Sequence, residues 1–106
     1  MGLALHTTRQ GDRVVVTARG SIDLHSSDEL RQRLEALAEA GHKEIVVDLT
    51  AVDFCDSSGL NVLVRAYKNA RDRNASFSVT GAYGRVENVL HTTGLDRFLI
   101  GAPREG

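Results

Sequence analysis

The sequence has little or none of several residues on which particular functions depend. It contains one cysteine, one proline, two tyrosines, three phenylalanines and no tryptophan. The lone thiol, Cys55, excludes an intramolecular disulfide and gives no cysteine pair for a zinc site. So few aromatic side chains offer little from which to build a base-stacking platform for single-stranded nucleic acid. The four histidines are scattered, without the spacing of metal ligands.

The sequence also lacks an excess of either charge and any long apolar run. Thirteen Lys and Arg residues nearly balance fourteen Asp and Glu, for a net charge of -1. A broad basic surface for nucleic acid or anionic lipid is therefore not expected. No apolar run approaches the ~20 residues that cross a bilayer, and residues 1–6 lack the charged head and long apolar stretch of a signal peptide. We expect a cytoplasmic protein with no direct nucleic-acid or membrane partner.

The remaining composition is that of an ordinary globular protein. Hydrophobic residues make up 42% of the chain and charged residues 25%, which argues against wholesale disorder. A length of 106 residues suits one domain. We expect a single domain over residues 1–106, with an ordered core over about residues 3–100 and a loose tail that holds Pro103 and Gly106. We expect so small a domain to be a monomer.

Hydrophobic periodicity predicts alternating strands and helices. A β-branched run bounded by glycines predicts a strand over residues 13–19, after a shorter strand near Leu3 and Leu5 and a hairpin turn at residues 10–12. A helix is expected to start at Ser26, with Glu29 at capping-box spacing. The further predicted elements are a buried strand over 44–49, a loop over 50–56, a helix over 57–74, a strand over 75–80, a helix over 85–93 and a short last strand over 98–100.

This order, β-β-α-β-α-β-α-(β), predicts an α/β fold. Each β-α-β step implies parallel neighbours joined by a right-handed crossover. The opening hairpin adds an antiparallel pair. The sheet is therefore expected to be mixed.

The strongest functional signal lies where the buried strand leads into the second helix. Loops at the carboxyl ends of parallel strands commonly hold the sites of α/β folds. Ser57 is expected at the start of the helix, where unpaired amides and the helix dipole tolerate a phosphate. That phosphate would add about -1.5 to -2 charges beside Asp53 and Asp56, which is typical of a phosphorylation switch of binding. Asp and Ser are also common N-caps, and the local chemistry by itself favours a plain helix start.

Other functions of the same stretch are less well supported by its residues. The run Asp56-Ser57-Ser58-Gly59 is not the Gly-x-Ser-x-Gly elbow of serine hydrolases. Asp48, Asp53 and Asp56 are a candidate Mg²⁺ site of the kind found in receiver domains, although solvated loop carboxylates are the preferred interpretation. Cys55 is expected to be a packing residue, because no cation stands beside it in the sequence.

Four segments together resemble the STAS domain and, more narrowly, the bacterial anti-anti-sigma factors (anti-sigma factor antagonists). These segments are Gly20-Ser21-Ile22-Asp23, Val46-Val47-Asp48-Leu49, Phe54-Cys55-Asp56-Ser57-Ser58-Gly59-Leu60 and Val86-x-x-Val89-Leu90-x-x-Thr93-Gly94-Leu95. The resemblance covers about residues 3–100. It implies one domain with a mixed sheet of four to five strands and helices packed mainly on one face.

The resemblance implies a regulator and not an enzyme, with no catalytic residue, metal or cofactor of its own. In this family the unmodified protein binds an anti-sigma factor, which is also a serine kinase, and so frees the sigma factor. The kinase phosphorylates the first serine of the Asp-Ser-Ser/Thr-Gly motif, which corresponds to Ser57, and the phosphorylated form lets go. A PP2C-type phosphatase restores the protein. The implied partner-binding residues are Asp23, Asp56, Ser57, Ser58 and Gly59.

The sequence departs from the family's common pattern at three positions. Ser21 stands where many members have an acidic residue, Gly84 where many have proline, and Asn88 where many have a basic residue. These differences bear on partner choice and leave the expected phosphoacceptor untouched. Two other interpretations stay open. One is a non-switching STAS scaffold or ligand-sensing module, and the other is the Mg-dependent receiver-like domain.

Overall fold

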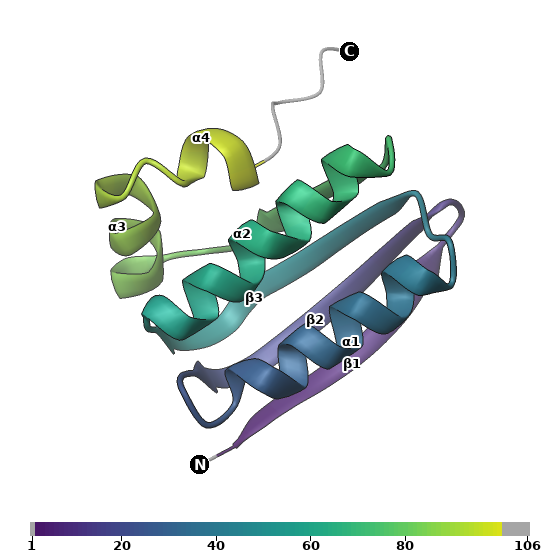
Figure 1. The fold of residues 1–106 in the computed structure, drawn as a ribbon. Coiled ribbons are helices and arrows are strands. Elements are labelled where there is room, and N and C mark those ends of the chain that lie inside the picture. The colour runs from purple at the N-terminus through teal and green to yellow at the C-terminus, as the bar shows by residue number, and fades with distance from the viewer. Residues whose placement is uncertain (1, 101–106) are drawn as a thin grey trace.

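Four strands form one mixed sheet, in the spatial order β1-β2-β3-β4. The computed structural model describes residues 2–100, and Figure 1 shows how its strands and helices are arranged. The elements are β1 (Leu3–Gln10), β2 (Arg13–Ile22), α1 (Ser27–Glu39), β3 (Glu44–Cys55), α2 (Ser57–Asp72), β4 (Ser76–Thr80), α3 (Gly84–Thr92) and α4 (Asp96–Leu99). The predicted α/β class and mixed sheet are confirmed.

The first two strands make the predicted hairpin. β1 is antiparallel to β2, and Gln10 pairs with Arg13, so only Gly11 and Asp12 form the turn. Gly11 has a φ of 66°, a conformation that glycine adopts without steric cost. The β2–β3 and β3–β4 pairs are parallel, as the β-α-β order requires.

β3 is longer than the sequence indicates, because the predicted loop over residues 50–56 is mostly strand. The strand continues to Cys55. Its pairing with β4 ends at Asp48, whereas its pairing with β2 runs on to Cys55 through two register irregularities. Such irregularities interrupt the strict alternation of inward and outward side chains, so the pattern of residues 50–55 resembles a loop. The extra length carries the chain past the end of β4 to the start of α2.

The predicted last strand over residues 98–100 is wrong. Residues Asp96–Leu99 form the short helix α4, and Ile100 alone makes an isolated bridge to Val79. Three consecutive apolar residues do not distinguish a strand from a buried helical turn. In the structure this segment is helical, and Leu99 is buried in the core. The tail predicted to hold Pro103 and Gly106 lies outside the described residues.

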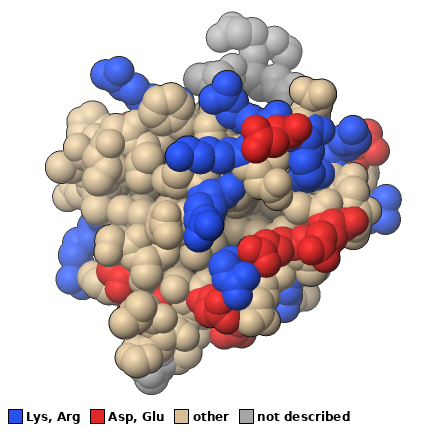
Figure 2. Space-filling model, viewed as in Figure 1, with Lys and Arg blue, Asp and Glu red and all other residues tan. Residues whose placement is uncertain are grey.

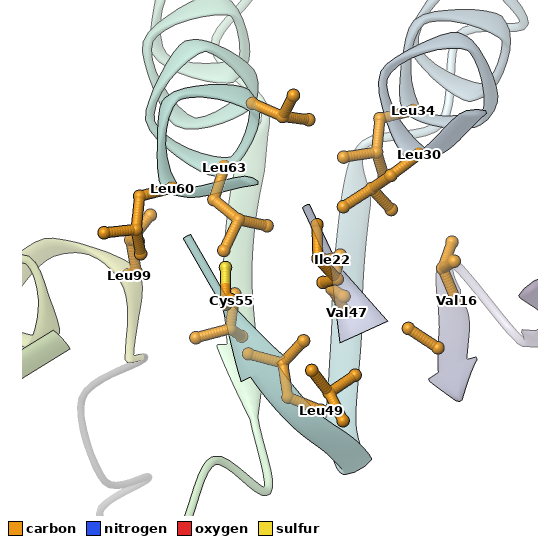
Figure 3. Packing of buried hydrophobic residues seen from close by; sticks show 14 of the residues in the cluster. Val16, Ile22, Leu30, Leu34, Val47, Leu49, Cys55, Leu60, Leu63 and Leu99 are labelled. Carbon is orange, nitrogen blue, oxygen red and sulfur yellow. The ribbon is translucent and has the colours of Figure 1, made fainter. Parts of the chain in front are cut away.

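The core lies between the sheet and the two long helices. Figure 1 shows α1 and α2 side by side across one face of the sheet, as expected from the family resemblance, with α3 and α4 beyond α2. Figure 3 shows Leu30 and Leu34 of α1 and Leu63 of α2 pointing toward Ile22 and Val47 of the sheet. No helix within residues 2–100 is both long enough and apolar enough to cross a membrane.

A substitution at Leu63 tests how much this core contributes to stability. The side chain is 0% exposed, and we expect Leu63→Ala to lower the free energy of unfolding by about 2–5 kcal/mol, because a cavity replaces it. Leu24→Ala is the matched control, since Leu24 is 73% exposed and its change is expected to stay within about 0.5 kcal/mol. Urea denaturation measures both. Equal losses in the two variants would contradict the packing described here.

Candidate functional site

The start of α2 is fixed by Asp56, the residue that links it to β3. The Asp56 N–H donates to the carbonyl oxygen of Ile22, at 3.0 Å, and so ties the helix start to the end of β2. The backbone of Asp56 is extended, and its Oδ1 accepts hydrogen bonds from the amides of Ser58, at 2.9 Å, and Gly59, at 3.2 Å. The Ser58 hydroxyl also donates to this oxygen. Asp56 is therefore the N-cap that satisfies the helix end.

These contacts hold Asp56 in its ionised form. The hydrogen bond from the Ser58 hydroxyl is the largest cause that lowers its pKa, and the backbone amides of Gly59, Ser58 and Leu24 lower it further against an opposing effect of burial. Hydrogen bonds donated to a carboxylate favour the charged form. A negative charge thus stands permanently at the N-terminus of α2 near neutral pH.

Ser57 is the first residue of α2, and its side chain is exposed. Its hydroxyl takes part in none of the hydrogen bonds formed among residues 2–100, whereas the neighbouring Ser58 hydroxyl is bound to Asp56. Asp56 and Ser58 therefore have the structural role of starting the helix. The Ser57 hydroxyl is available for chemistry at the surface without the loss of a stabilising contact.

Gly59 allows α2 to approach the sheet at this point. A Cβ at this position would lie 2.6 Å from Ile22 Cγ2 and 2.7 Å from Cys55 Sγ, which is closer than real atoms pack. Cys55 is buried beneath the helix start, and burial, with a smaller effect of Asp56, raises the pKa of its thiol to about 12. The thiol stays neutral, and Cys55 packs as the sequence predicts.

The loop between β2 and α1 is held by Asp23 and Ser26. Asp23 Oδ1 accepts from the amides of His25, at 3.0 Å, and Ser26, at 3.1 Å, and the Ser26 amide is the first cause of a lowered pKa at Asp23. The Ser26 hydroxyl donates to the Ser21 carbonyl oxygen at 2.8 Å. It makes no capping bond to α1, so the predicted capping box with Glu29 does not form. The Ser26 hydroxyl is therefore bonded within the loop and does not cap α1.

The other two carboxylates of this region have separate partners. Asp53 Oδ1 accepts from the Ser21 hydroxyl at 2.9 Å, and Asp48 Oδ1 accepts from the Thr50 amide at 2.9 Å. Within the part of the chain that the structure describes, no group of three His, Cys, Asp or Glu side chains is placed to hold a metal ion. The candidate Mg²⁺ site at Asp48, Asp53 and Asp56 is therefore wrong, because β3 continues through Asp48 and Asp53 to Cys55 and leaves Asp56 as the N-cap of α2.

Two exposed apolar side chains near Ser57 were missed by sequence reasoning. Leu24 is 73% exposed and Phe54 is 39% exposed. Phe54 pairs with Ser21 in the β2–β3 register, and the Leu24 amide is one of the groups that lower the pKa of Asp56, so both belong to the edge at which α2 begins. The available signal was an apolar residue directly after an aspartate, Leu24 after Asp23 and Phe54 after Asp53, in segments predicted to be loops. Together, Leu24, Phe54, Asp56 and Ser57 form what we call the switch edge.

Comparison with known proteins assigns the family. A family model described as "Mlab, STAS domain" matches residues 5–101. The chain belongs to the STAS domain family. The predicted family is thereby confirmed over nearly the whole sequence.

Curated relatives of this STAS domain carry regulatory names. An anti-sigma-B factor antagonist of Listeria monocytogenes is 30% identical over 91 residues, which span 86% of this chain and 80% of that protein. An anti-sigma-B factor antagonist of Staphylococcus aureus is 28% identical over 95 residues, with coverage of 90% and 88%.

Solved structures agree in fold with this STAS domain. An anti-sigma factor antagonist from Mycobacterium paratuberculosis is 28% identical, with a TM-score of 0.83 and coverage of 92% of this chain and 82% of that one. The anti-sigma factor antagonist SpoIIAA in its unphosphorylated form has a TM-score of 0.80 at 18% identity, with coverage of 95% and 90%. At that identity the likeness concerns the fold alone.

The N-cap provides a test of the site's geometry. Asp56→Ala is expected to lower the free energy of unfolding by about 1 kcal/mol at pH 7, because the amides of Ser58 and Gly59 lose their acceptor. The pKa of Asp56 is lower when folded than its ordinary 3.8, so the charge-dependent stabilisation is present above that value and is lost as the pH falls through the folded pKa. Urea denaturation between pH 7 and pH 2 measures this.

Asp56→Asn is the matched control for that measurement. Asparagine caps helices about as well as aspartate but does not titrate, so this variant should keep most of the stability and lose the pH dependence that Asp56 contributes. A difference between wild type and Asp56→Ala that stays constant down to pH 2 would contradict a capping role for the ionised carboxylate.

Proposed function

We propose that this protein is an anti-sigma factor antagonist whose binding is switched off by phosphorylation of Ser57. The names of its relatives support the general role. The single observation that carries the switch is the exposed Ser57 at the first turn of α2, whose hydroxyl makes no hydrogen bond within residues 2–100, unlike that of Ser58. One related fold is also known in a phosphorylated form, that of the Bacillus protein SpoIIAA.

The electrostatics of the helix start explain why a phosphate would act on a partner and not on the fold. Helix N-termini neutralise anions through free amides. Here Asp56 already accepts from the amides of Ser58 and Gly59. A phosphate on Ser57 would therefore remain at the surface and add about -1.5 to -2 charges beside an ionised Asp56. The backbone has no need to move, and the change falls on whatever is docked there.

The partner is an anti-sigma factor that docks on the switch edge and carries the kinase activity. Exposed Leu24 and Phe54 supply the apolar contact that specific interfaces place at their centre. Asp23 and Asp56, with lowered pKa values, keep the surrounding surface negative. Extra negative charge at the centre of such a contact costs desolvation and repels acidic groups of the partner. The unmodified protein binds, and the phosphorylated protein is released.

Ser58 and Gly59 have indirect roles in this proposal. The Ser58 hydroxyl is engaged by Asp56, and Gly59 is buried against Ile22 and Cys55. They shape the switch edge, while Leu24, Phe54, Asp56 and Ser57 meet the partner. The exposed position of Ser57 also suits removal of its phosphate by a PP2C-type phosphatase, which makes the switch reversible.

The modification site is tested with the kinase that co-purifies with this protein from its native cells. After incubation with ATP, mass spectrometry should find one phosphate on Ser57, and Ser57→Ala should abolish it. Ser58→Ala is the matched control and should still be modified at Ser57. Full modification of Ser57→Ala would refute the assignment.

Binding by the same partner tests the switch. Ser57→Ala should bind the anti-sigma factor as the unmodified protein does, and the phosphorylated protein should bind at least about tenfold more weakly, because charge at a docked surface costs several kcal/mol. Ser57→Asp carries less charge than a phosphate and should weaken binding in part. Titration calorimetry measures all four proteins. Equal affinity of the phosphorylated and unmodified forms would end the proposal.

The apolar part of the switch edge is tested separately. Phe54→Ala should weaken binding to the anti-sigma factor about tenfold or more, because truncation of a central apolar anchor costs over 1 kcal/mol. The matched control is Phe98→Ala. Phe98 is 55% exposed on α4, where its ring pairs with Tyr67 farther along α2. If the two variants bind equally, the partner docks elsewhere.

A further inference from the structure

A second surface feature lies between α1 and α2, away from the switch edge. The two helices enclose an open hollow of about 690 Å³, within the size range of small-molecule sites. Three small side chains keep it open: Ala38 on α1, and Ala66 and Ala70 on α2. None of residues 54–60 lines it. The hollow is thus independent of the proposed phosphorylation site.

The floor of the hollow is apolar. It is made by Leu34, Ile45, Val62 and Phe77, and all four side chains also belong to the hydrophobic core. An apolar chain laid on this floor would leave water, at a gain of about 25 cal/mol per Å² of apolar surface removed from it. The floor therefore favours a ligand with a hydrocarbon part.

The rim of the hollow is charged and has a slight positive excess. In Figure 2, Lys and Arg gather mainly over α2, and Asp and Glu over α1. The charged lining residues are three arginines, Arg31, Arg65 and Arg73, and two glutamates, Glu35 and Glu39, which leave one positive charge. Arg31 is paired with Glu35, at 2.9 Å, and also with Asp28 of the same helix. The remaining charged lining residues are Glu39 on α1 and Arg65 and Arg73 on α2, so the one positive charge in excess lies on the α2 side.

Arg73 has an unusual environment. Its Nε is buried and has no hydrogen-bond acceptor among residues 2–100, and Nη2 makes only a long contact of 3.4 Å to the His42 carbonyl oxygen. The buried Nε lies too deep for a ligand in the hollow to reach, so the donors that Arg73 can offer there are those of its Nη atoms. The guanidinium group presents its donors as a planar fork that matches a carboxylate. Arg73 lines the hollow, and its weakly engaged Nη donors point to an anionic acceptor.

We propose that the hollow between α1 and α2 binds a small amphiphile that has an alkyl chain and a single carboxylate. The chain lies on Leu34, Val62 and Phe77, and the carboxylate accepts hydrogen bonds from Arg73 with Arg65 beside it. The net charge of the rim matches a monoanion. A dianion would leave one charge uncompensated opposite Glu39.

Titration calorimetry with sodium decanoate, kept below the concentration at which it forms micelles, tests the proposal on the isolated protein. We expect saturable one-to-one binding and a raised melting temperature, since a ligand that binds only the folded state stabilises it. Decyltrimethylammonium has the same chain with the opposite charge and should not bind. Acetate has the same head without the chain and should not bind either.

Two pairs of variants locate the site. Ala66→Leu fills the hollow and should abolish decanoate binding, whereas Ala36→Leu on the exposed side of α1 should leave it unchanged. Arg73→Gln should weaken binding about tenfold or more, as expected for loss of a charge-assisted hydrogen bond. Arg71→Gln removes an arginine that stacks near Tyr67, outside the hollow, and should have no effect. Circular dichroism confirms that each variant is folded.

Three outcomes would overturn the proposal. They are no binding of decanoate, equal binding of decanoate and decyltrimethylammonium, or unchanged decanoate binding by both Ala66→Leu and Arg73→Gln. None of these measurements involves Ser57 or an anti-sigma factor. Failure of the ligand site is therefore distinguishable from failure of the proposed switch.

Discussion

The geometry at the start of α2 depends on the set of hydrogen bonds centred on Asp56. Its N–H bonds to the carbonyl oxygen of Ile22, and its carboxylate accepts from the amides of Ser58 and Gly59. One residue thus joins the end of β2, the end of β3 and the start of α2. At this junction the Ser58 hydroxyl is bound to Asp56, whereas Ser57 is exposed.

The packing beneath Asp56 makes this junction rigid. Ile22, Cys55 and Gly59 meet so closely that a single added methyl group at residue 59 would collide with both neighbours. Close-packed interiors transmit strain instead of absorbing it. A modification at Ser57 is therefore expected to change the charge of the surface and leave the backbone in place, which is the physical basis of a switch that acts on a partner.

The molecule separates two kinds of surface along α2. At its N-terminus the exposed groups are acidic and apolar, and they suit protein docking. Farther along, the hollow between α1 and α2 is bordered by arginine and floored by core residues. Small alanines keep the hollow open, whereas nearer the helix start Leu63 fills the space against the sheet and Leu60 lies beside Leu99 of α4. The same helix thus carries the exposed Ser57 at its start and borders a ligand-sized hollow farther along.

The sequence alone determined the class of the fold, most of its elements and the family. Periodicity of apolar residues is a local property, so the β-β-α-β-α-β-α order and the position of Ser57 at a helix start could be predicted. The mixed character of the sheet also followed, because an opening hairpin gives an antiparallel pair and β-α-β steps join parallel strands.

Tertiary structure decided what local pattern does not encode. β3 extends to Cys55 because β2 continues to pair with it through irregular register, and this extension separates Asp48, Asp53 and Asp56, which had suggested a metal site. Residues 96–99 became a helix because Leu99 reaches the core. Asp56, not a serine, took the cap of α2, and Ser26 bonded within its loop and not to α1. Each of these outcomes depends on which groups compete for the same hydrogen bond or the same buried space, and that competition exists only once distant segments have met.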